Sequence, residues 1–128
     1  ATENVITFGG YDNVTNAFYP KSGRGFTREN RIKPDLTAPA VNVYGPGISG
    51  GYTRRTGTSV ACALGAGACA QILQWGIVED NEPYMINNYI KNYLIRGAER
   101  NRDIRYPSEQ WGYGTINVFD SFLILTRT

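Results

Sequence analysis

Small and apolar residues form a long run in the middle of the chain. Within residues 59–75, the polar side chains after Ser59 are Gln71 and Gln74, so the run is apolar on nearly every side. A helix without a polar face is one that the rest of its domain surrounds. The pattern therefore predicts a buried central helix that starts near Ser59.

Glycines interrupt this run and mark its end. Gly65 and Gly67 each lower helix propensity by about 1 kcal/mol relative to alanine, so we expect them to let strands or another helix approach closely. Gly76 is the expected C-cap. Residues 60–78 are apolar enough to raise the question of a membrane span. Their glycines, alanines and two glutamines make the segment only weakly hydrophobic, so we expect no membrane span.

Short apolar runs before the central helix predict strands. Residues 4–10 are β-branched and aromatic and stop at paired glycines, which indicates a strand covered on both faces. Residues 35–38 lie between two prolines and are expected to be extended. Residues 41–44 resemble a second buried strand, and residues 48–55 contain adjacent glycines that predict a tight hairpin.

The connection between the first two runs, residues 11–34, has no helical period. We expect an irregular surface segment with a short strand near residues 17–19. Its basic residues are expected to be solvated rather than to form a binding patch, because acidic residues dilute their charge and few aromatics lie between them. These basic residues are Lys21, Arg24, Arg28, Arg31 and Lys33.

Two further helices are predicted after the central one. Asp80 or Asn81 can cap the first, with Pro83 in its first turn, and Asn117 can cap the second. Each helix has one apolar face, which is more typical of core packing than of a ligand site. The two faces consist of Met85, Ile86, Tyr89, Ile90, Tyr93 and Leu94, and of Val118, Phe119, Phe122 and Leu123.

Composition limits the classes of protein and partner. The 128 residues, 41% of them hydrophobic, can form the core of one domain, and a net charge of +2 gives no reason to expect a nucleic-acid partner. Cys62 and Cys69 fall about 10 Å apart along the predicted helix, too far for a disulfide, and are expected to be buried packing residues. The sequence contains no histidine, and we expect no metal site and no cofactor.

Ser59 is the residue best placed for chemistry. A serine in the first turn of a buried helix lies beside unpaired backbone N–H groups and the positive end of the helix dipole. A nucleophilic serine also needs a base, and no histidine follows Ser59, which excludes the order serine, acid, histidine. The order acid, histidine, serine remains open. The alternative interpretation is that Ser59 is only a helix N-cap.

Five sequence blocks occur in a fixed order along the chain. They are VITFG at 5–9, SGRG at 22–25, RIKPDLTAP at 31–39, GTS at 57–59 with Ala61 and Gly67, and WGYGTIN at 111–117. The first block is similar to a family strand, and the second to the family's S-x-R-G turn. The third is similar to a K-P-D-[IVL]-x-A-P-G segment and the fourth to the block around the catalytic serine. The fifth is similar to a closing G-x-G-x-[IVL]-[ND] element. These are blocks of the subtilases, the subtilisin-like serine proteases of peptidase family S8, which the whole chain resembles.

The resemblance implies that residues 1–128 are the C-terminal, incomplete segment of one subtilisin-like catalytic domain. That domain is a three-layer α/β/α fold with a mostly parallel sheet. The family's catalytic aspartate, catalytic histidine and oxyanion asparagine would belong to about 200 residues expected before Ala1. Ser59 is then the nucleophile of a serine endopeptidase that acts on peptide or protein substrates, and the isolated chain is expected to be inactive.

Four positions depart from the family pattern. Val60 replaces a methionine, Ala63 a proline, Leu64 a common histidine and Ala40 a glycine. The pattern resembles a divergent branch from anaerobic spore-forming and gut bacteria, which implies a secreted, cell-envelope or spore-associated location. The departures leave the nucleophile in place and motivate an alternative, a pseudoprotease or regulatory binding module that keeps the fold.

A further alternative is a soluble α/β domain in which Ser59 has no catalytic role. The resemblance also has a consequence for assembly, since the missing half of the sheet would cover part of this chain. A sheet cut through its middle exposes a strand edge near residues 5–8, so we expect docking with the remainder of the domain and self-association through that edge.

Overall fold

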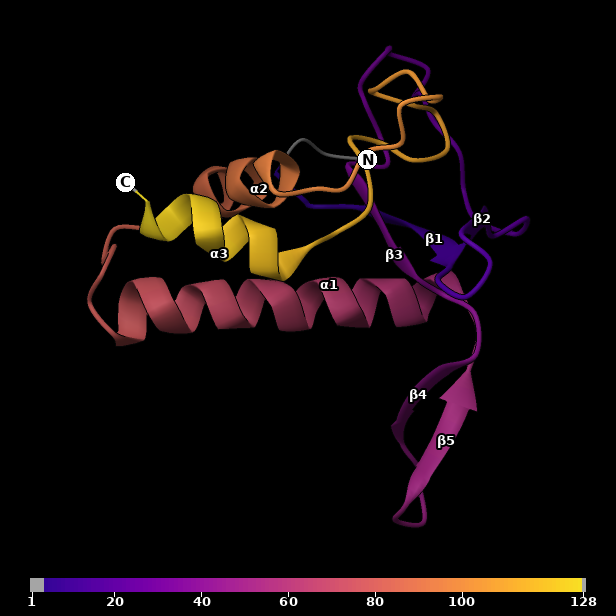
Figure 1. The fold of residues 1–128 in the computed structure, drawn as a ribbon, viewed down its shortest axis with the longest axis horizontal. Helices are drawn as coiled ribbons and strands as arrows, with labels where there is room; N and C mark the ends of the chain where they lie inside the picture. The colour runs from indigo at the N-terminus through magenta and orange to yellow at the C-terminus, as the bar shows by residue number, and fades with distance from the viewer. Residues whose placement is uncertain (1–3, 128) are drawn as a thin grey trace.

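A computed structural model describes residues 4–127 of the chain, and Figure 1 shows its mixed helices and strands. The long helix α1 lies beside the short helices α2 and α3, and strands cross near its N-terminal end. The elements in chain order are β1 (Phe8–Asp12), β2 (Ala17–Phe18), β3 (Leu36–Pro39), β4 (Val43–Pro46), β5 (Tyr52–Arg55), α1 (Thr58–Leu73), the π-helical turn η1 (Gln74–Val78), α2 (Asn87–Arg96) and α3 (Val118–Thr126). The α/β class expected from the sequence is confirmed.

The main sheet of the described residues has the order β2-β1-β3, with β1 parallel to β3 and antiparallel to β2. The short strand expected near residues 17–19 is thus confirmed. The strand expected at residues 4–10 instead begins at Phe8 and runs through both glycines. A Cβ on Gly10 would lie 2.5 Å from the Cβ of Ala40, so here glycine permits a close approach of two segments rather than ending the strand.

The block at residues 111–117 completes the sheet beside β3. The Thr37 N–H donates to the Gly114 carbonyl at 2.9 Å, and the Ile116 N–H donates to the Thr37 carbonyl at 2.8 Å. Gly112 has a φ of 59° in the turn that precedes these bonds. The free edge of β3 is therefore covered, and the segment at 35–38 that was expected to be extended is the buried parallel strand.

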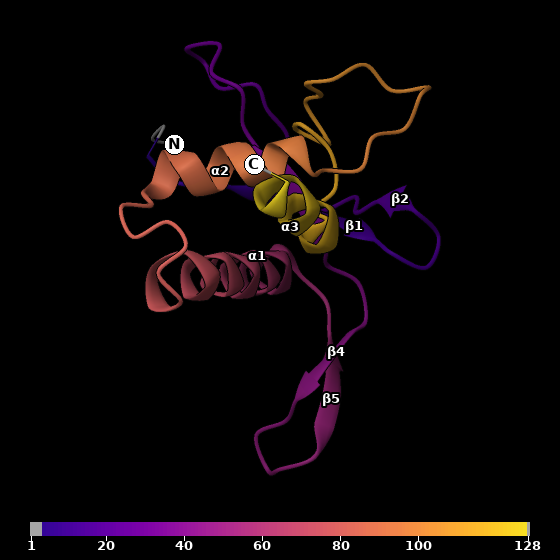
Figure 2. The same cartoon turned by 60° about the vertical axis from the view of Figure 1, so that its left-hand side comes forward.

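The strands β4 and β5 form a hairpin that points away from the rest of the molecule in Figures 1 and 2. Gly50 and Gly51 have positive φ in its turn, so the predicted hairpin is confirmed. The expectation of a buried strand at residues 41–44 is wrong. Tyr44 is 64% exposed, because β4 pairs with β5 in a separate ribbon rather than with the main sheet.

The helix α1 packs on the sheet through one face, which consists of Ala61, Gly65, Ala68 and Ile72. A Cβ on Gly65 would lie 2.2 Å from the Phe8 ring, so the expected close approach at Gly65 is confirmed. Around Gly67 the described residues leave open space, and no close approach occurs there. The expectation that the helix is buried on every side is wrong for the described residues, because many of its other small apolar residues are exposed. The exposed ones are Cys62, Ala63, Leu64, Ala66, Gly67 and Ala70.

The sequence predicted that both cysteines of α1 are buried and that the helix spans no membrane, and the structure bears on both predictions. Cys62 is exposed and Cys69 is half-buried, both as free thiols, so the expected burial of Cys62 is wrong. Residues Thr58–Val78 also have the length and composition of a membrane span. That test alone is weak evidence for a membrane, and the helix packs against β1 through Gly65.

The end of the central helix lies beyond the expected C-cap. Gly76 is inside η1, where its small size leaves room for the Met85 side chain. The expected helix start at residues 80–83 is also wrong, because α2 begins at Asn87 with Ile86 as its N-cap. The residues between them close the preceding turns instead, with the Glu82 N–H bonded to the Gly76 carbonyl at 2.8 Å.

The last helix begins as the sequence predicts. The Asn117 side chain accepts a hydrogen bond from the Asp120 N–H at 3.0 Å and caps α3. Its expected apolar face is only partly right, since Phe119 is 72% exposed whereas Ser121 and Leu125 are buried. The main core joins sheet and helices and consists of Leu36, Ala68, Ile72, Met85, Ile90, Leu94, Ala98 and Leu125.

Candidate active site

Ser59 is exposed and is the second residue of α1. The N-cap is Gly57, with a φ of 150°, and no side chain of the described residues makes a capping hydrogen bond there. The interpretation of Ser59 as an N-cap is therefore wrong. Its hydroxyl is left available at the helix start, and a Cβ on Gly57 would lie 3.4 Å from that Oγ.

The turn before Ser59 is fixed to the end of the main sheet. The Gly57 N–H donates to the carbonyl of Ala40 at 2.7 Å, and Ala40 directly follows β3. The methyl group of Thr58 faces Gly10 on β1. The turn thus places Ser59 at the carboxyl end of two parallel strands, which is where open α/β sheets bind their ligands.

The start of α1 favours negative charge. The Val60 N–H donates to the Gly57 carbonyl at 3.1 Å, whereas the N–H groups that precede it in the first turn have no partner within the helix. No acidic residue lies in this turn, so the positive end of the helix dipole is not neutralised there. A negative oxygen that develops beside Ser59 would be stabilised by these N–H groups.

A pocket of about 380 Å³ opens beside Ser59, between the β4–β5 hairpin and the start of α1. Three of the positions that depart from the family pattern line it, namely Val60, Ala63 and Leu64. The rest of its wall consists of Val43, Tyr44, Gly45, Pro46, Thr53 and Arg55. Arg55 is the charged member of this lining, and the sequence interpretation did not single it out.

A buried ion cluster supports the sheet behind this site. The Asp35 carboxylate is 1% exposed and pairs with Lys33 at 2.7 Å and with Lys91 of α2 at 2.9 Å. It also accepts a hydrogen bond from the Thr7 N–H at 2.8 Å. Burial alone would raise the pKa of Asp35, but the hydrogen bonds from Lys33, Thr7 and Lys91 outweigh it and lower that pKa.

This cluster corrects the sequence interpretation of Lys33. Lys33 was expected to be solvated with the other basic residues of its loop, but it is 6% exposed. Its Nζ also donates to the Val5 carbonyl at 2.7 Å. The spacing of Lys33 and Asp35 was a usable signal, because residues two apart in an extended segment share a face. Lys91 could not be found this way, since it belongs to a distant helix.

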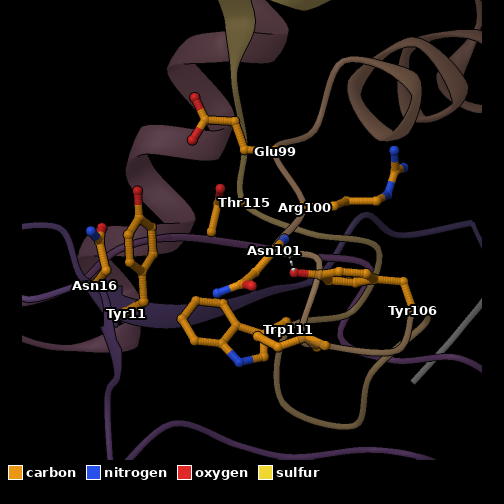
Figure 3. A pocket seen from close by; sticks show the side chains of 9 residues that line it. Tyr11, Asn16, Glu99, Arg100, Asn101, Tyr106, Trp111 and Thr115 are labelled. Atoms are coloured by element: carbon orange, nitrogen blue, oxygen red, sulfur yellow. Dashed lines mark hydrogen bonds between the residues drawn. The ribbon is translucent and has the colours of Figure 1, made fainter.

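A second pocket, of about 270 Å³, contains none of the residues that line the Ser59 pocket. Figure 3 shows Tyr11, Trp111 and Tyr106 around it, with the ring centroids of Tyr11 and Trp111 5.7 Å apart. Burial raises the pKa of Tyr11, and the negative charge of Glu99 raises it further. The Tyr106 hydroxyl accepts a hydrogen bond from the Asn101 N–H at 2.9 Å, which holds one wall of the pocket in place.

Neither pocket offers a metal-binding cluster. Among residues 4–127, no three histidine, cysteine, aspartate or glutamate side chains gather closely enough to hold a metal ion. The chain also contains no histidine that could serve Ser59 as a base. The described arrangement therefore supplies a hydroxyl, unpaired N–H groups and a pocket, and no histidine beside them.

Known proteins match this chain over nearly its whole length. The model of the Subtilase family matches residues 1–114. Pyrolysin of Pyrococcus furiosus is 31% identical over 125 residues, and these cover 92% of this chain. The membrane-bound transcription factor site-1 protease of Mus musculus is 30% identical over 130 residues, which cover 96% of the chain. The chain spans only 9% and 12% of the lengths of these two relatives.

Solved structures show the same architecture. The CspB protease of Clostridium perfringens has a TM-score of 0.94 and 36% sequence identity, covering 99% of this chain and 28% of that one. The patellamide maturation protease PatA has a TM-score of 0.76 at 22% identity, covering 98% of this chain and 44% of that one. The PatA likeness supports the fold alone, whereas the CspB likeness extends to sequence.

Proposed function

The chain belongs to the subtilase family, and from this premise we propose that Ser59 is the nucleophile of a serine endopeptidase. The observation that carries the proposal is the position of Ser59, which is exposed, does not cap its helix and lies at the carboxyl end of parallel strands. Its hydroxyl would attack a peptide carbonyl, and the N–H groups of the first turn of α1 would stabilise the resulting oxyanion.

The remaining catalytic groups would come from residues upstream of this chain. We propose that residues 1–128 are the C-terminal segment of one catalytic domain, whose upstream part supplies the histidine as base and the aspartate that orients it. The exposed apolar residues of α1 outside the Ser59 pocket support this division, because a helix with small residues on its open side can accept another close-packed segment. They include Cys62, Ala66, Gly67 and Ala70.

A peptidase assay on the full-length protein tests the proposed function. The unmodified protein is expected to hydrolyse a fluorogenic peptide library, and Ser59→Ala is expected to lower the rate by at least about a thousandfold. Ser49→Ala is the matched control, because Ser49 is an exposed serine in the hairpin turn. An undiminished rate in Ser59→Ala would overturn the assignment of the nucleophile.

A pseudoprotease or binding module is the second candidate function. It is supported by Val60, Ala63 and Leu64, which depart from the family pattern and line the pocket beside Ser59. The pocket in Figure 3 offers such a module a separate binding surface. The upstream sequence discriminates between the two candidates, because a missing aspartate or histidine there would favour the pseudoprotease.

The proposed partners and location follow from the same premise. The partners are a peptide or protein substrate and the remainder of the catalytic domain, with self-association as a property of the isolated segment. We propose that the parent protein comes from a bacterium and is secreted or held at the cell envelope or spore. Fractionation of the source cells, with detection by an antibody against this segment, tests that location.

A further inference from the structure

The pocket beside Ser59 contains an arginine that has no acidic partner among residues 4–127. Arg55 is exposed and is the charged residue in the described lining of this pocket. Within the part of the chain that the structure describes, its guanidinium Nη1 donates to two neutral oxygens, Thr53 Oγ1 at 3.3 Å and the Arg54 carbonyl at 3.4 Å. The ion pairs of the described residues do not include it. A mostly apolar pocket with one free cation is suited to a ligand that carries a carboxylate.

The hairpin fixes Arg55 close to the serine. Arg55 is the last residue of β5 and pairs with Val43 of β4, which lines the same pocket. The neighbouring Arg54 does not line the pocket, and its guanidinium lies 5.4 Å from the centre of the Tyr44 ring. Four residues of extended chain span at most about 14 Å, so Arg55 lies within that distance of Ser59 along the backbone.

We infer that Arg55 is a specificity-determining residue that selects peptide substrates with an aspartate or glutamate within about four residues of the scissile bond. The inference rests on the proposed function of Ser59. A guanidinium binds a carboxylate through two parallel N–H···O bonds, whereas a glutamine of nearly the same shape offers one acceptor and no charge. An acidic side chain would therefore hold the substrate beside the nucleophile, and a basic one would be repelled.

The test compares substrates in the full-length protein. A peptide library first locates a cleaved sequence, and each position within four residues of the cut is then varied to Glu, Gln and Lys. At one of these varied positions, kcat/KM for the Glu peptide is expected to exceed kcat/KM for the Gln peptide by about tenfold. It is expected to exceed kcat/KM for the Lys peptide by a larger factor. The ratio is expected to fall as salt is added, because Arg55 is exposed to the screening ions.

Matched variants separate Arg55 from general charge effects. Arg55→Glu is expected to reverse the preference from Glu to Lys at that position, whereas Arg54→Glu makes the same charge change outside the pocket and is expected to leave it unchanged. Equal kcat/KM for Glu, Gln and Lys, or an equal effect of both variants, would overturn the inference about Arg55 and leave the proposed function of Ser59 untouched. Intact peptides together with an unlabelled Ser59 after fluorophosphonate treatment would instead overturn the proposed function.

Discussion

The Phe8 ring occupies the space in front of Gly65, so that a Cβ on Gly65 would lie 2.2 Å from the ring. This contact joins the first residue of β1 to the buried face of α1, the helix that presents Ser59. The position of the candidate nucleophile relative to the sheet thus depends on a residue without a side chain. Substitutions at Gly65 should reveal that dependence.

We expect Gly65→Ala to destabilise the chain by about 1–3 kcal/mol, because the added methyl group overpacks the contact with Phe8. Gly67→Ala is the control on the same helix, since the described residues leave open space around it. That control should gain up to about 1 kcal/mol from helix propensity. Thermal unfolding of the 128-residue chain followed by circular dichroism measures both, and equal stabilisation by the two variants would contradict the proposed packing.

Asp35→Asn is expected to cost about 3–5 kcal/mol, because it leaves Lys33 and Lys91 beside a neutral group in a buried site. Glu29→Gln provides the control, since Glu29 forms an exposed pair with Arg31 and should change stability by less than about 1 kcal/mol. Urea unfolding measures both changes. Similar small losses in the two variants would show that the buried cluster contributes little.

The same aspartate should make stability depend on pH. Burial raises the pKa of Asp35, but hydrogen bonds from Lys33, Thr7 and Lys91 together hold it below its ordinary value. The unfolded chain therefore takes up this proton at a higher pH than the folded chain. The contribution of Asp35 is complete above about pH 5 and is lost progressively as the pH falls through the pKa of the unfolded and then of the folded chain. The difference in unfolding free energy between wild type and Asp35→Asn should shrink at low pH, and a constant difference would refute this.

The isolated chain is expected to self-associate through surfaces that the rest of the domain would cover. The strand β2 pairs only with Tyr11 and Asp12, which leaves the first half of β1 without a strand on that side among the described residues. Ala66 is an exposed residue of α1 that does not line the Ser59 pocket. Sedimentation velocity should show that Ala66→Lys weakens association more than Ile48→Lys at the hairpin tip. A monomer at high concentration would count against the prediction.

Local signals in the sequence predicted local structure well. Asn117 caps α3 because its side chain reaches an N–H three residues later, and adjacent glycines gave the hairpin turn. Ser59 could be singled out as the candidate nucleophile because a small-residue turn before an apolar helix is visible in the sequence alone. Its availability as a hydroxyl, with Gly57 as the N-cap, required the structure.

Features that depend on distant contacts could not be predicted. Lys33 was placed with the solvated residues because the second cation of the buried cluster, Lys91, belongs to a helix far away in the sequence. The helix start expected at residues 80–83 lies instead at Asn87, because the residues before it close the end of η1. The position of Arg55 in the pocket beside Ser59 also required the structure, because the hairpin brings its strand beside the start of α1.

The central claim is that Ser59 is a nucleophile completed by residues outside this chain. Fluorophosphonate labelling, with the modified residue located by mass spectrometry, tests it most directly in the full-length protein and in the 128-residue chain. We predict labelling of Ser59 in the full-length protein and none in the isolated chain, where no histidine can activate the hydroxyl. An unlabelled Ser59 in the full-length protein, or rapid labelling of the isolated chain, would contradict the claim.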